Sequence, residues 1–292
     1  MSSADFPTAL AAALTTRRFG RVHEHAASLE STNDRALAWL GGSGESPAPD
    51  GALVTADRQT AGRGRLGRAW SSAPAGDIYA SVVVRPGATR TAAGQSFGAL
   101  ALAVGVGLRE GVGAALRGCG RPELAERLSL KWPNDLLLDG RKLAGILCES
   151  RWRGRSVDVV VGFGVNVGRE RFEGPLADTA TSLRLALGAA PPARAELLAA
   201  TLAALEDSLD AFFDRGFPAL RPRYEPHCVV LGRRVEVETP GRGRVSALAL
   251  SLDPDGALRV REDDGRELRV ESADVWLSPD HAMPAPCGSP SD

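Results

Sequence analysis

The chain has 292 residues, a hydrophobic fraction of 43%, a charged fraction of 24% and a formal net charge of −1. This length is enough for one large domain, or for a large domain and a small one. The near-zero charge argues against a general nucleic-acid-binding or polybasic membrane protein, and no apolar run approaches the roughly eighteen residues of a membrane span. The four cysteines form no CxxC pair, which favours free thiols and a cytoplasmic location.

The first part of the chain alternates short predicted elements with turns. Residues 1–18 have no basic residue before their Ala/Leu run, so they predict a surface helix or arm and not a signal peptide. His23 and His25 alternate along a predicted strand and can share a face; without a third ligand nearby they indicate a structural pair more than a metal site. Ser31 to Asp34 predicts a helix cap followed by a helix. Runs rich in β-branched residues predict strands at 51–57 and 78–86.

The middle of the chain predicts a long helix, a hairpin and a second long helix. Residues 95–117 are apolar and long enough for a buried helix, although five internal glycines weaken that prediction. Asp139-Gly140 is typical of a type I′ turn and predicts that 136–138 and 141–150 are antiparallel partners. A buried strand is predicted at 158–167, and apolar residues at helical spacing predict an amphipathic helix over 193–215.

The pattern changes near Pro226. From 229 to 277 short strands alternate with turns, which favours a small β-barrel or sandwich. The chain therefore predicts an α/β (α+β) fold with a mixed domain at 1–227 and a β module at 228–279, and residues 280–292 predict a disordered tail.

Glycine and arginine alternate in QTAGRGRLGRAW, residues 59–70, which we call the arginine loop. Gly62 to Gly67 matches G-x-G-x-x-G, but no helix follows, so the dinucleotide-binding interpretation fails. Three arginines in this loop, together with Arg58 just before it, supply planar forks suited to phosphate or carboxylate oxygens. A loop that closes over an anionic ligand is favoured, with a solvated basic turn as the alternative.

Of 35 basic residues only two are lysines, Lys131 and Lys142. A compact ammonium is needed where one charge must reach one oxygen between tight walls. Strand alternation places Lys142 on one face with Ala144, Ile146 and Cys148, an unusual position for a charge that only meets water. A functional role is favoured for Lys142 over simple snorkelling to water. For Lys131 the two are balanced, because it could instead pair with Asp135 or Asp139.

Four segments in order resemble the signature segments of biotin protein ligases. They are STND at 31–34, QTAGRGRLGRAW at 59–70, KWPNDLLLDGRKLAGIL at 131–147 and GFGVNV at 162–167. The resemblance implies an enzyme that uses ATP and Mg²⁺ to convert biotin to biotinyl-5′-AMP and then biotinylates a lysine of a biotin carboxyl carrier protein. It also implies a catalytic domain like that of class II aminoacyl-tRNA synthetases, built on a mixed, mainly antiparallel sheet, and a C-terminal SH3-like barrel.

The resemblance also implies roles for individual residues. Catalysis is assigned to Lys142, Arg65 and Asp135. Biotin binding is assigned to Ser31, Thr32, Asn33, Gln59, Arg63, Arg65, Trp70, Lys142 and Gly145. Nucleotide binding is assigned to Arg65, Arg68, Lys131, Asn134, Gly164 and Asn166, with Mg²⁺ near Asn134 and Asp135. Alternatives stay open for Ser31 as a helix cap only, for Trp70 as plain core, and for Asn134 and Asp135 as turn builders.

Some expectations stay open. The family loop often has arginine where Leu66 stands, which puts the contribution of a third charge in doubt, and Phe172 is a candidate to cover the adenine.

The matching region begins near residue 20, so a ligase without an N-terminal DNA-binding domain, and no DNA partner, is expected. A homodimer through a sheet edge and a monomer are both compatible. The rivals are a lipoate or octanoate ligase or transferase of the same fold and, less favoured, a nucleic-acid-binding or adaptor protein.

Overall fold

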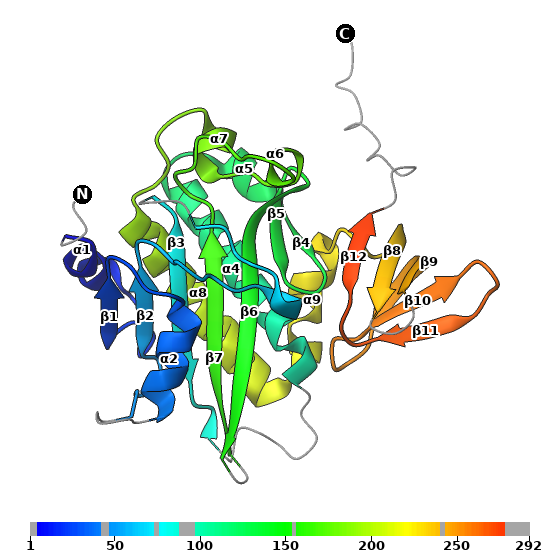
Figure 1. Cartoon of the computed structure of the whole chain (residues 1–292), viewed down its shortest axis with the longest axis horizontal. Coiled ribbons are helices and arrows are strands. Elements are labelled where there is room, and N and C mark those ends of the chain that lie inside the picture. The colour runs from blue at the N-terminus through cyan, green and yellow to red at the C-terminus, as the bar shows by residue number, and fades with distance from the viewer. Residues whose placement is uncertain are drawn as a thin grey trace.

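The computed structural model describes residues 5–41, 47–72, 76–87, 97–153, 156–239 and 243–277. Figure 1 shows a large sheet flanked by helices and a smaller sheet beside it. The predicted tail at 280–292 lies outside the described residues.

The larger sheet has seven strands in the order β1-β2-β3-β7-β6-β5-β4. These strands are β1 (His23–Ala26), β2 (Leu53–Ala56), β3 (Ile78–Val84), β4 (Leu128–Lys131), β5 (Asp135–Leu138), β6 (Arg141–Arg153) and β7 (Ser156–Val165). The pair β1 and β2 is parallel, and every other neighbouring pair is antiparallel. The prediction of a mixed, mainly antiparallel sheet is therefore confirmed.

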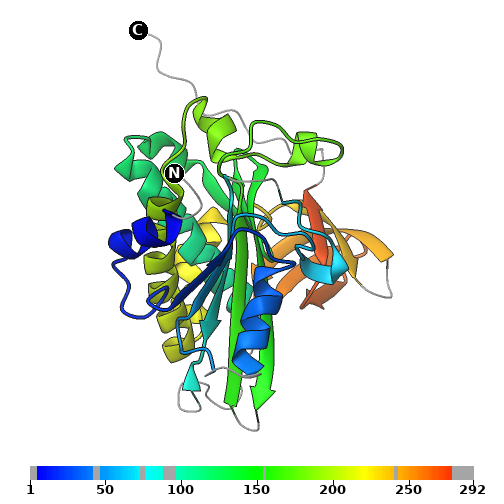
Figure 2. The same cartoon turned by 60° about the vertical axis from the view of Figure 1, so that its left-hand side comes forward.

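Helices cover both faces of this sheet. They are α1 (Phe6–Ala13), α2 (Thr32–Gly41), α4 (Leu100–Gly118), α5 (Pro122–Glu126), α6 (Leu176–Thr179), α7 (Leu183–Leu187), α8 (Arg194–Arg215) and α9 (Arg221–Tyr224). Short 3-10 turns are η1 (Arg65–Gly67), η2 (Phe97–Ala99), η3 (Phe217–Ala219) and η4 (Glu225–His227). The pair α4 and α8 packs on one face and α2 on the other (Figure 2). The three helices predicted from capping and periodicity are confirmed, whereas the short helices α5, α6, α7 and α9 were not predicted.

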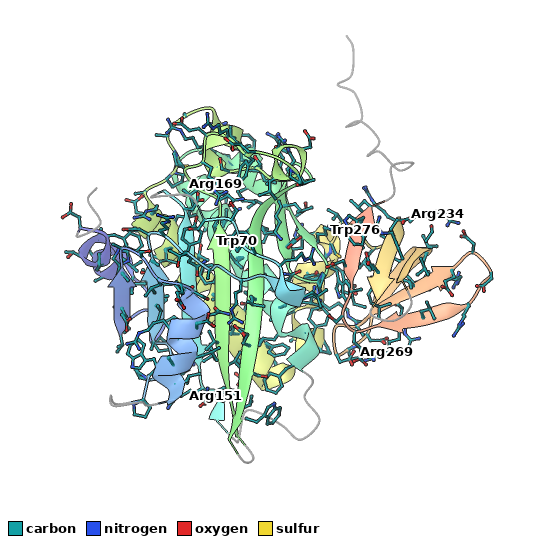
Figure 3. The ribbon with its side chains drawn as sticks, viewed as in Figure 1. Trp70, Arg151, Arg169, Arg234, Arg269 and Trp276 are labelled. Atoms are coloured by element: carbon teal, nitrogen blue, oxygen red, sulfur yellow. The ribbon has the colours of Figure 1, made fainter. Side chains whose placement is uncertain are left out.

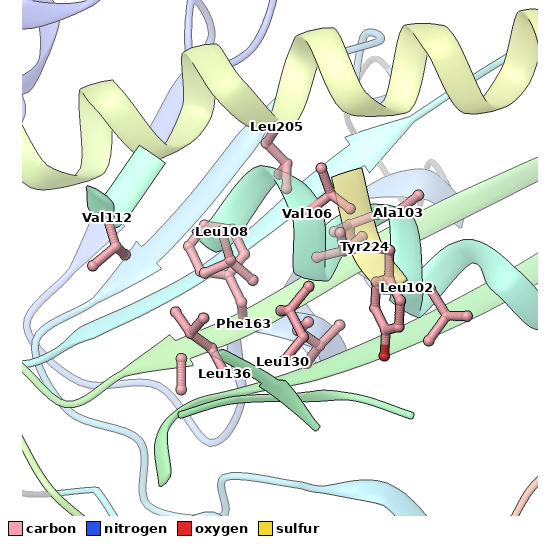
Figure 4. Close-up of a cluster of buried hydrophobic side chains, with 14 of the residues drawn as sticks. Leu102, Ala103, Val106, Leu108, Val112, Leu130, Leu136, Phe163, Leu205 and Tyr224 are labelled. Atoms are coloured by element: carbon pink, nitrogen blue, oxygen red, sulfur yellow. The ribbon is translucent and has the colours of Figure 1, made fainter. Parts of the chain in front are cut away.

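The main core lies between the sheet and the α4–α8 pair (Figure 4). The internal glycines of α4 allow the two helices to approach closely, because a Cβ at Gly111 would lie 2.4 Å from Thr201 Cα and one at Gly107 would lie 2.7 Å from Leu205 Cα. By length and composition Phe97–Gly118 could also cross a membrane, but 72% of that stretch is buried inside the fold, as expected for a core helix.

The smaller sheet has the order β11-β10-β9-β8-β12, with antiparallel pairing throughout. Its strands are β8 (Arg234–Thr239), β9 (Gly243–Leu252), β10 (Leu258–Glu262), β11 (Glu267–Val270) and β12 (Asp274–Leu277). Two hydrogen bonds join it and the chain leading into it to the larger sheet: Trp132 Nε1 donates to Gly256 O at 3.0 Å, and Val229 N donates to Leu130 O at 2.9 Å. These contacts place β12 beside the end of β4 (Figure 1).

Two local predictions from the sequence agree with the structure. Asp139 and Gly140 both have positive φ, 53° and 74°, as a type I′ turn requires, and β5 pairs with β6 across that turn. His23 and His25 lie on β1 and share one face, since Nε2 of the first and Nδ1 of the second lie 2.7 and 2.9 Å from Thr55 Oγ1. The histidines thus belong to the sheet edge.

Candidate functional site

A cavity of about 340 Å³ opens on the face of the larger sheet that carries α2. Its lining comes from residues 31–33 at the start of α2, the arginine loop, the strands β4 to β7 with their connections, residues 169–180 and β12 of the smaller sheet. Every site residue predicted from the sequence lies on this lining: Ser31, Thr32, Asn33, Gln59, Arg63, Arg65, Arg68, Trp70, Lys131, Asn134, Asp135, Lys142, Gly145, Gly164 and Asn166. The structure therefore brings the four signature segments together.

Lys142 lies on a different face of β6 from the one that simple alternation predicts. Its Nζ would lie 3.3 Å from a Cβ on Gly145, whereas Ala144 is fully buried in the core. The register explains the error: Leu137 pairs with Lys142 but Leu136 pairs with Ala144, so Leu143 is an extra residue on β6. Such a bulge shifts the alternation by one residue and turns the lysine toward the cavity.

The Lys142 ammonium forms an ion pair with the Asp135 carboxylate. Its Nζ lies 2.6 Å from Asp135 Oδ1 and 5.5 Å from the centre of the Trp70 ring. The alternative in which Lys131 pairs with Asp135 or Asp139 is not formed, since Asp135 pairs with Lys142 and Asp139 pairs with Arg127. The β-bulge at Leu143 explains this pairing, because it turns Lys142 toward the Asp135 carboxylate.

The Lys131 ammonium has neither an ion pair nor a hydrogen bond with the described residues, whereas the backbone of Lys131 pairs with Asp135 in the β4–β5 ladder. Burial lowers the pKa of its ammonium; Asp135 opposes that change and the neighbouring Lys142 adds to it. A cation that is buried in a cleft without a partner favours an anionic ligand.

A pair of glycines forms a flat shelf under Trp70. Gly145 of β6 and Gly164 of β7 face each other across the ladder. A Cβ at either position would lie 2.6 Å from the indole, so only glycine lets the ring rest on the sheet. The indole Nε1 is buried without an acceptor among the described residues, which means that packing rather than hydrogen bonding holds the ring.

One end of the cavity is polar but uncharged. Gln59 Oε1 accepts hydrogen bonds from Thr32 N at 2.8 Å and Thr32 Oγ1 at 3.1 Å. Ser81 Oγ lies 2.8 Å from Thr32 Oγ1 and 2.6 Å from Asn33 Oδ1, and it was not singled out from the sequence. Ser31 does cap α2, because Asp34 N donates to its Oγ at 3.4 Å. The network fixes these groups before any ligand arrives.

The arginine loop, to which Gln59 itself belongs, adjoins this polar group and folds back on itself as a small hairpin. Gly64 N donates to Arg68 O at 2.7 Å and Trp70 N donates to Gly62 O at 2.8 Å. At the tip Leu66 has a positive φ of 55° and is 58% exposed, so it contacts little of the protein. The guanidinium groups on either side of this tip connect the loop to other parts of the protein.

Each of the three loop arginines meets an acceptor from another part of the chain. Arg63 NH2 lies 2.8 Å from Glu149 Oε2, and Arg65 donates to Asn134 Oδ1 at 3.2 Å and to Ser272 Oγ at 2.7 Å. Arg68 pairs with Asp274 of β12. Burial lowers the pKa of the Arg65 guanidinium. Neither Glu149 nor Asp274 was identified from the sequence, because each lies far along the chain from the loop.

The remaining side of the cavity is formed by the segment after β7. Asn166 Nδ2 donates to Thr181 O at 3.0 Å, so its amide ties the two ends of this segment together. Arg169 donates from Nε to Asp77 Oδ2 at 2.6 Å and contacts the Phe172 ring at 5.2 Å. Figure 3 shows Arg169 and Trp70 near the same end of β7. Sequence reasoning did not single out Arg169 or Asp77.

The predicted metal-binding pair is already engaged within the protein. Asn134 Nδ2 donates to Ile146 O at 2.8 Å and its Oδ1 accepts from Arg65, so its amide builds the turn. Asp135 pairs with Lys142. The described residues contain no group of three or more His, Cys, Asp or Glu side chains that could hold a metal ion. A single carboxylate fits a magnesium ion that arrives with nucleotide phosphates, since Mg²⁺ takes few protein ligands in such sites.

Comparisons with known proteins agree with this geometry. Residues 26–166 match the model "Biotin/lipoate A/B protein ligase family", and residues 230–278 match "Biotin protein ligase C terminal domain". The chain is 35% identical to the biotin–[acetyl-CoA-carboxylase] ligase of Paracoccus denitrificans, over 86% of this chain and 98% of that protein. It is 36% identical to the ligase of the same name from Mycobacterium tuberculosis, over 77% and 79% respectively.

A solved structure shares the architecture. The biotin protein ligase from Aquifex aeolicus in complex with biotin and ATP matches with a TM-score of 0.68 and 26% sequence identity, covering 88% of this chain and 100% of that chain.

Proposed function

The chain belongs to the biotin protein ligase family, and we propose on that premise that its cleft activates biotin with ATP and passes it to a carrier protein. The observation that carries this proposal is the mixed lining of one cavity: uncharged hydrogen-bonding groups and positively charged side chains both line it, together with Trp70 on its glycine shelf. Biotin has a neutral ureido ring at one end and a carboxylate at the other, and this arrangement matches both.

The neutral end is assigned to the ureido ring. Its hydrogen-bonding groups, Ser31, Thr32, Asn33 and Gln59, offer both donors and acceptors, as does a cyclic urea. Trp70 and Gly145 enclose the apolar chain between the two ends of biotin. Because the amide and hydroxyl groups are already fixed by one another, the ring enters a prepared site.

The charged end is assigned to the first chemical step. An oxygen of the biotin carboxylate attacks the α-phosphorus of ATP, the bond to the β-phosphate oxygen breaks, and pyrophosphate leaves. Lys142 holds the carboxylate oxygen and then the phosphate of the adenylate, which offsets the repulsion between two anions. Lys131, the unpaired cation, is placed to bind a nucleotide phosphate together with Arg68. Asn166 completes the nucleotide side, and Gly164 serves that side by supporting the Trp70 ring, which also lines the biotin channel.

The arginine loop is assigned to retention of the adenylate. Its guanidinium groups now contact acidic or polar side chains at the protein surface, and such exposed pairs are weak. Adenylate phosphate would replace those partners, with Arg63 and Arg65 on the biotin side and Arg68 on the nucleotide side. Retention shields a reactive mixed anhydride from water. Phe172, near Arg169, is the candidate to cover the adenine.

Asp135 is the residue assigned to Mg²⁺, with Asn134 beside it. The ion supplies charge neutralisation of the ATP phosphates when bound. In the second step the amine of the carrier lysine attacks the carbonyl carbon of biotinyl-AMP and AMP leaves. Asp135 is then the nearby carboxylate that accepts a hydrogen bond from the attacking amine.

The larger architecture follows from the same family assignment. We assign 1–227 to a catalytic domain like that of class II aminoacyl-tRNA synthetases and 228–279 to an SH3-like module. The module contributes Ser272 and Asp274 to the arginine loop, which supports a joint role. The acceptor is a biotin carboxyl carrier protein in the cytoplasm, and a homodimer through a sheet edge is one oligomeric form to test.

The test uses purified protein, Mg-ATP and either biotin or lipoate, with pyrophosphate release measured over one turnover. The expected result is a biotin-dependent burst that leaves biotinyl-AMP on the protein and is discharged by a carrier domain. A burst with lipoate alone would move the substrate to the other branch of the family. Absence of a burst with both acids would contradict the proposed reaction.

A further inference from the structure

One guanidinium joins the two segments that flank the cavity. Arg169 donates from Nε to Asp77 Oδ2 at 2.6 Å, while its NH1 lies 3.1 Å from Ser71 Oγ and its NH2 bonds to Ser71 O. Ser71 follows directly after Trp70 at the end of the arginine loop. The side chain of Arg169 is only 8% exposed and its contact with Asp77 is shielded from solvent, whereas Ser71 is itself an exposed residue.

Asp77 provides a fixed anchor for this guanidinium. Its carboxylate is 1% exposed and also accepts hydrogen bonds from Val167 N at 2.8 Å and Gly168 N at 3.2 Å. On the other side, Ser182 Oγ donates to Arg169 O at 2.5 Å, which closes the base of the segment 170–181. Arg169 therefore links an immobile carboxylate, the end of the arginine loop and the start of that segment.

The N–H groups of Arg169 are distributed over its partners in a way that argues against an ion pair with Asp77 that serves stability alone. A pair formed only for stability would place the two parallel N–H groups of the fork on one carboxylate. Here only Nε meets Asp77, and both terminal nitrogens extend to Ser71, with a longer contact of 3.5 Å from NH2 to Tyr79 Oη. Buried ion pairs also add little net stability, because desolvation offsets their attraction. The second half of the fork fixes the loop end relative to the opposite segment.

We infer that Arg169 is a positioning residue that couples biotin binding to nucleotide binding; this inference rests on the proposed function. Biotin that contacts Trp70 orders the loop end at Ser71. Through Arg169 that order extends to the segment carrying Phe172, whose ring lies 5.2 Å from the guanidinium carbon. Once one ligand has bound, less conformational entropy is lost when the site of the other ligand becomes ordered, so the two ligands bind with positive cooperativity.

The experiment measures dissociation constants of α,β-methylene-ATP, which cannot form the adenylate, with and without saturating biotin. The ratio of the two constants is the coupling factor, typically about 5- to 150-fold where sites are coupled. We expect Arg169→Met to reduce this factor to within about threefold of unity, while biotin still binds the variant. Arg169→Lys should keep one contact to Asp77 but not the fork to Ser71, so it should lose coupling as well.

Arg171→Met is the matched control, because Arg171 is 84% exposed, lies two residues away and pairs only with Glu173 among the described residues. It should keep the wild-type factor. The inference is overturned if the wild-type factor is close to one, if Arg169→Met retains it, or if Arg169→Lys restores it fully. Failure of the wild-type protein to bind biotin at all would instead contradict the proposed function.

Discussion

The cleft has two positively charged sides that are built differently. On the lysine side, β4, β5, β6 and β7 form a continuous ladder, so the backbone fixes Lys131 and Lys142. On the arginine side, the tip of the loop at 62–70 pairs with itself and reaches the rest of the protein through arginine side chains. The first side is rigid in its backbone, and the second depends on exchangeable ionic contacts.

This difference suggests a division of labour. A fixed ammonium can hold two reacting anions at one distance, which suits the formation of a bond. Arginines that rest on exposed carboxylates can leave them at small cost for a phosphate, which suits retention of a product. The lysine side is therefore expected to set the rate of adenylate formation, and the arginine side its lifetime.

The largest effect is expected where the rigid side loses its compact charge. Lys142→Arg should slow adenylate formation by about 100-fold or more, because a planar fork cannot fit between Asp135 and the Trp70 ring without displacing the reacting oxygens. The pyrophosphate burst measures this rate, and thermal unfolding should show an intact fold. Arg127→Lys, whose side chain pairs with Asp139 at the exposed turn of the same hairpin, is the control that should leave the rate unchanged. A Lys142→Arg enzyme within threefold of wild type would refute the assignment.

The next effect concerns the shelf between the two sides. Gly164→Ala would place a methyl group 2.6 Å from the Trp70 indole, so the ring must move out of the biotin channel. Overpacking of this kind costs about 1–3 kcal/mol, which corresponds to a loss of roughly 5- to 150-fold in biotin affinity. Isothermal titration with biotin measures it. Gly118→Ala, where a Cβ meets nothing within 4 Å, should bind biotin normally; equal behaviour of the two variants would show that the shelf does not matter.

A smaller effect is expected at the ion pair that joins the arginine loop to β12. Asp274→Ala removes the partner of Arg68, and loss of an exposed pair worth about 1 kcal/mol or less should speed trypsin cleavage within the arginine loop by about two- to fivefold. Biotin with ATP should restore protection, because phosphate takes the place of the carboxylate. Asp263→Ala removes an ion pair of the same sheet with Arg234 and serves as control. Unchanged cleavage in Asp274→Ala would indicate that the loop does not depend on this contact.

The smallest effect on catalysis is expected far from both sides, at the sheet edge. Burial, with a smaller contribution from His25, lowers the pKa of His23 to about 4 from 6.5. A depressed folded-state pKa gives stability that is present above pH 6.5 and is lost as the pH falls toward 4; at pH 5 the loss is about 2 kcal/mol. Denaturant unfolding of wild type and His23→Gln at pH 7.5 and pH 5 tests this. The variant should lose less stability on acidification, and equal losses would contradict the prediction.

The sequence predicted much of the frame because its local signals agree with the fold. Alternating β-branched runs predicted β2, β3 and β7, and Asp139-Gly140 predicted the turn between β5 and β6. The sequence did not predict the side of β6 to which the Lys142 side chain points, because no local pattern marks Leu143 as the extra residue of a β-bulge.

Contacts between distant segments were also missed. Asp274 lies 206 positions after Arg68, and Asp77 lies 92 before Arg169, so neither pair leaves a trace in a local pattern. The shelf did leave a usable signal. Glycines at positions 162 and 164 within a predicted strand are typical of a place where another group approaches the backbone closely.

The division of labour can be tested in one experiment on two variants. Adenylate formation is followed by rapid quench, and its escape is followed by passing the loaded protein through a desalting column and measuring retained biotinyl-AMP over time. We predict that Lys142→Arg slows formation without hastening escape. Arg65→Gly should form the adenylate at a near-normal rate, release it faster and label bystander lysines. The account would be contradicted if both variants altered the same rate, or if Arg65→Gly kept its labelling confined to the carrier.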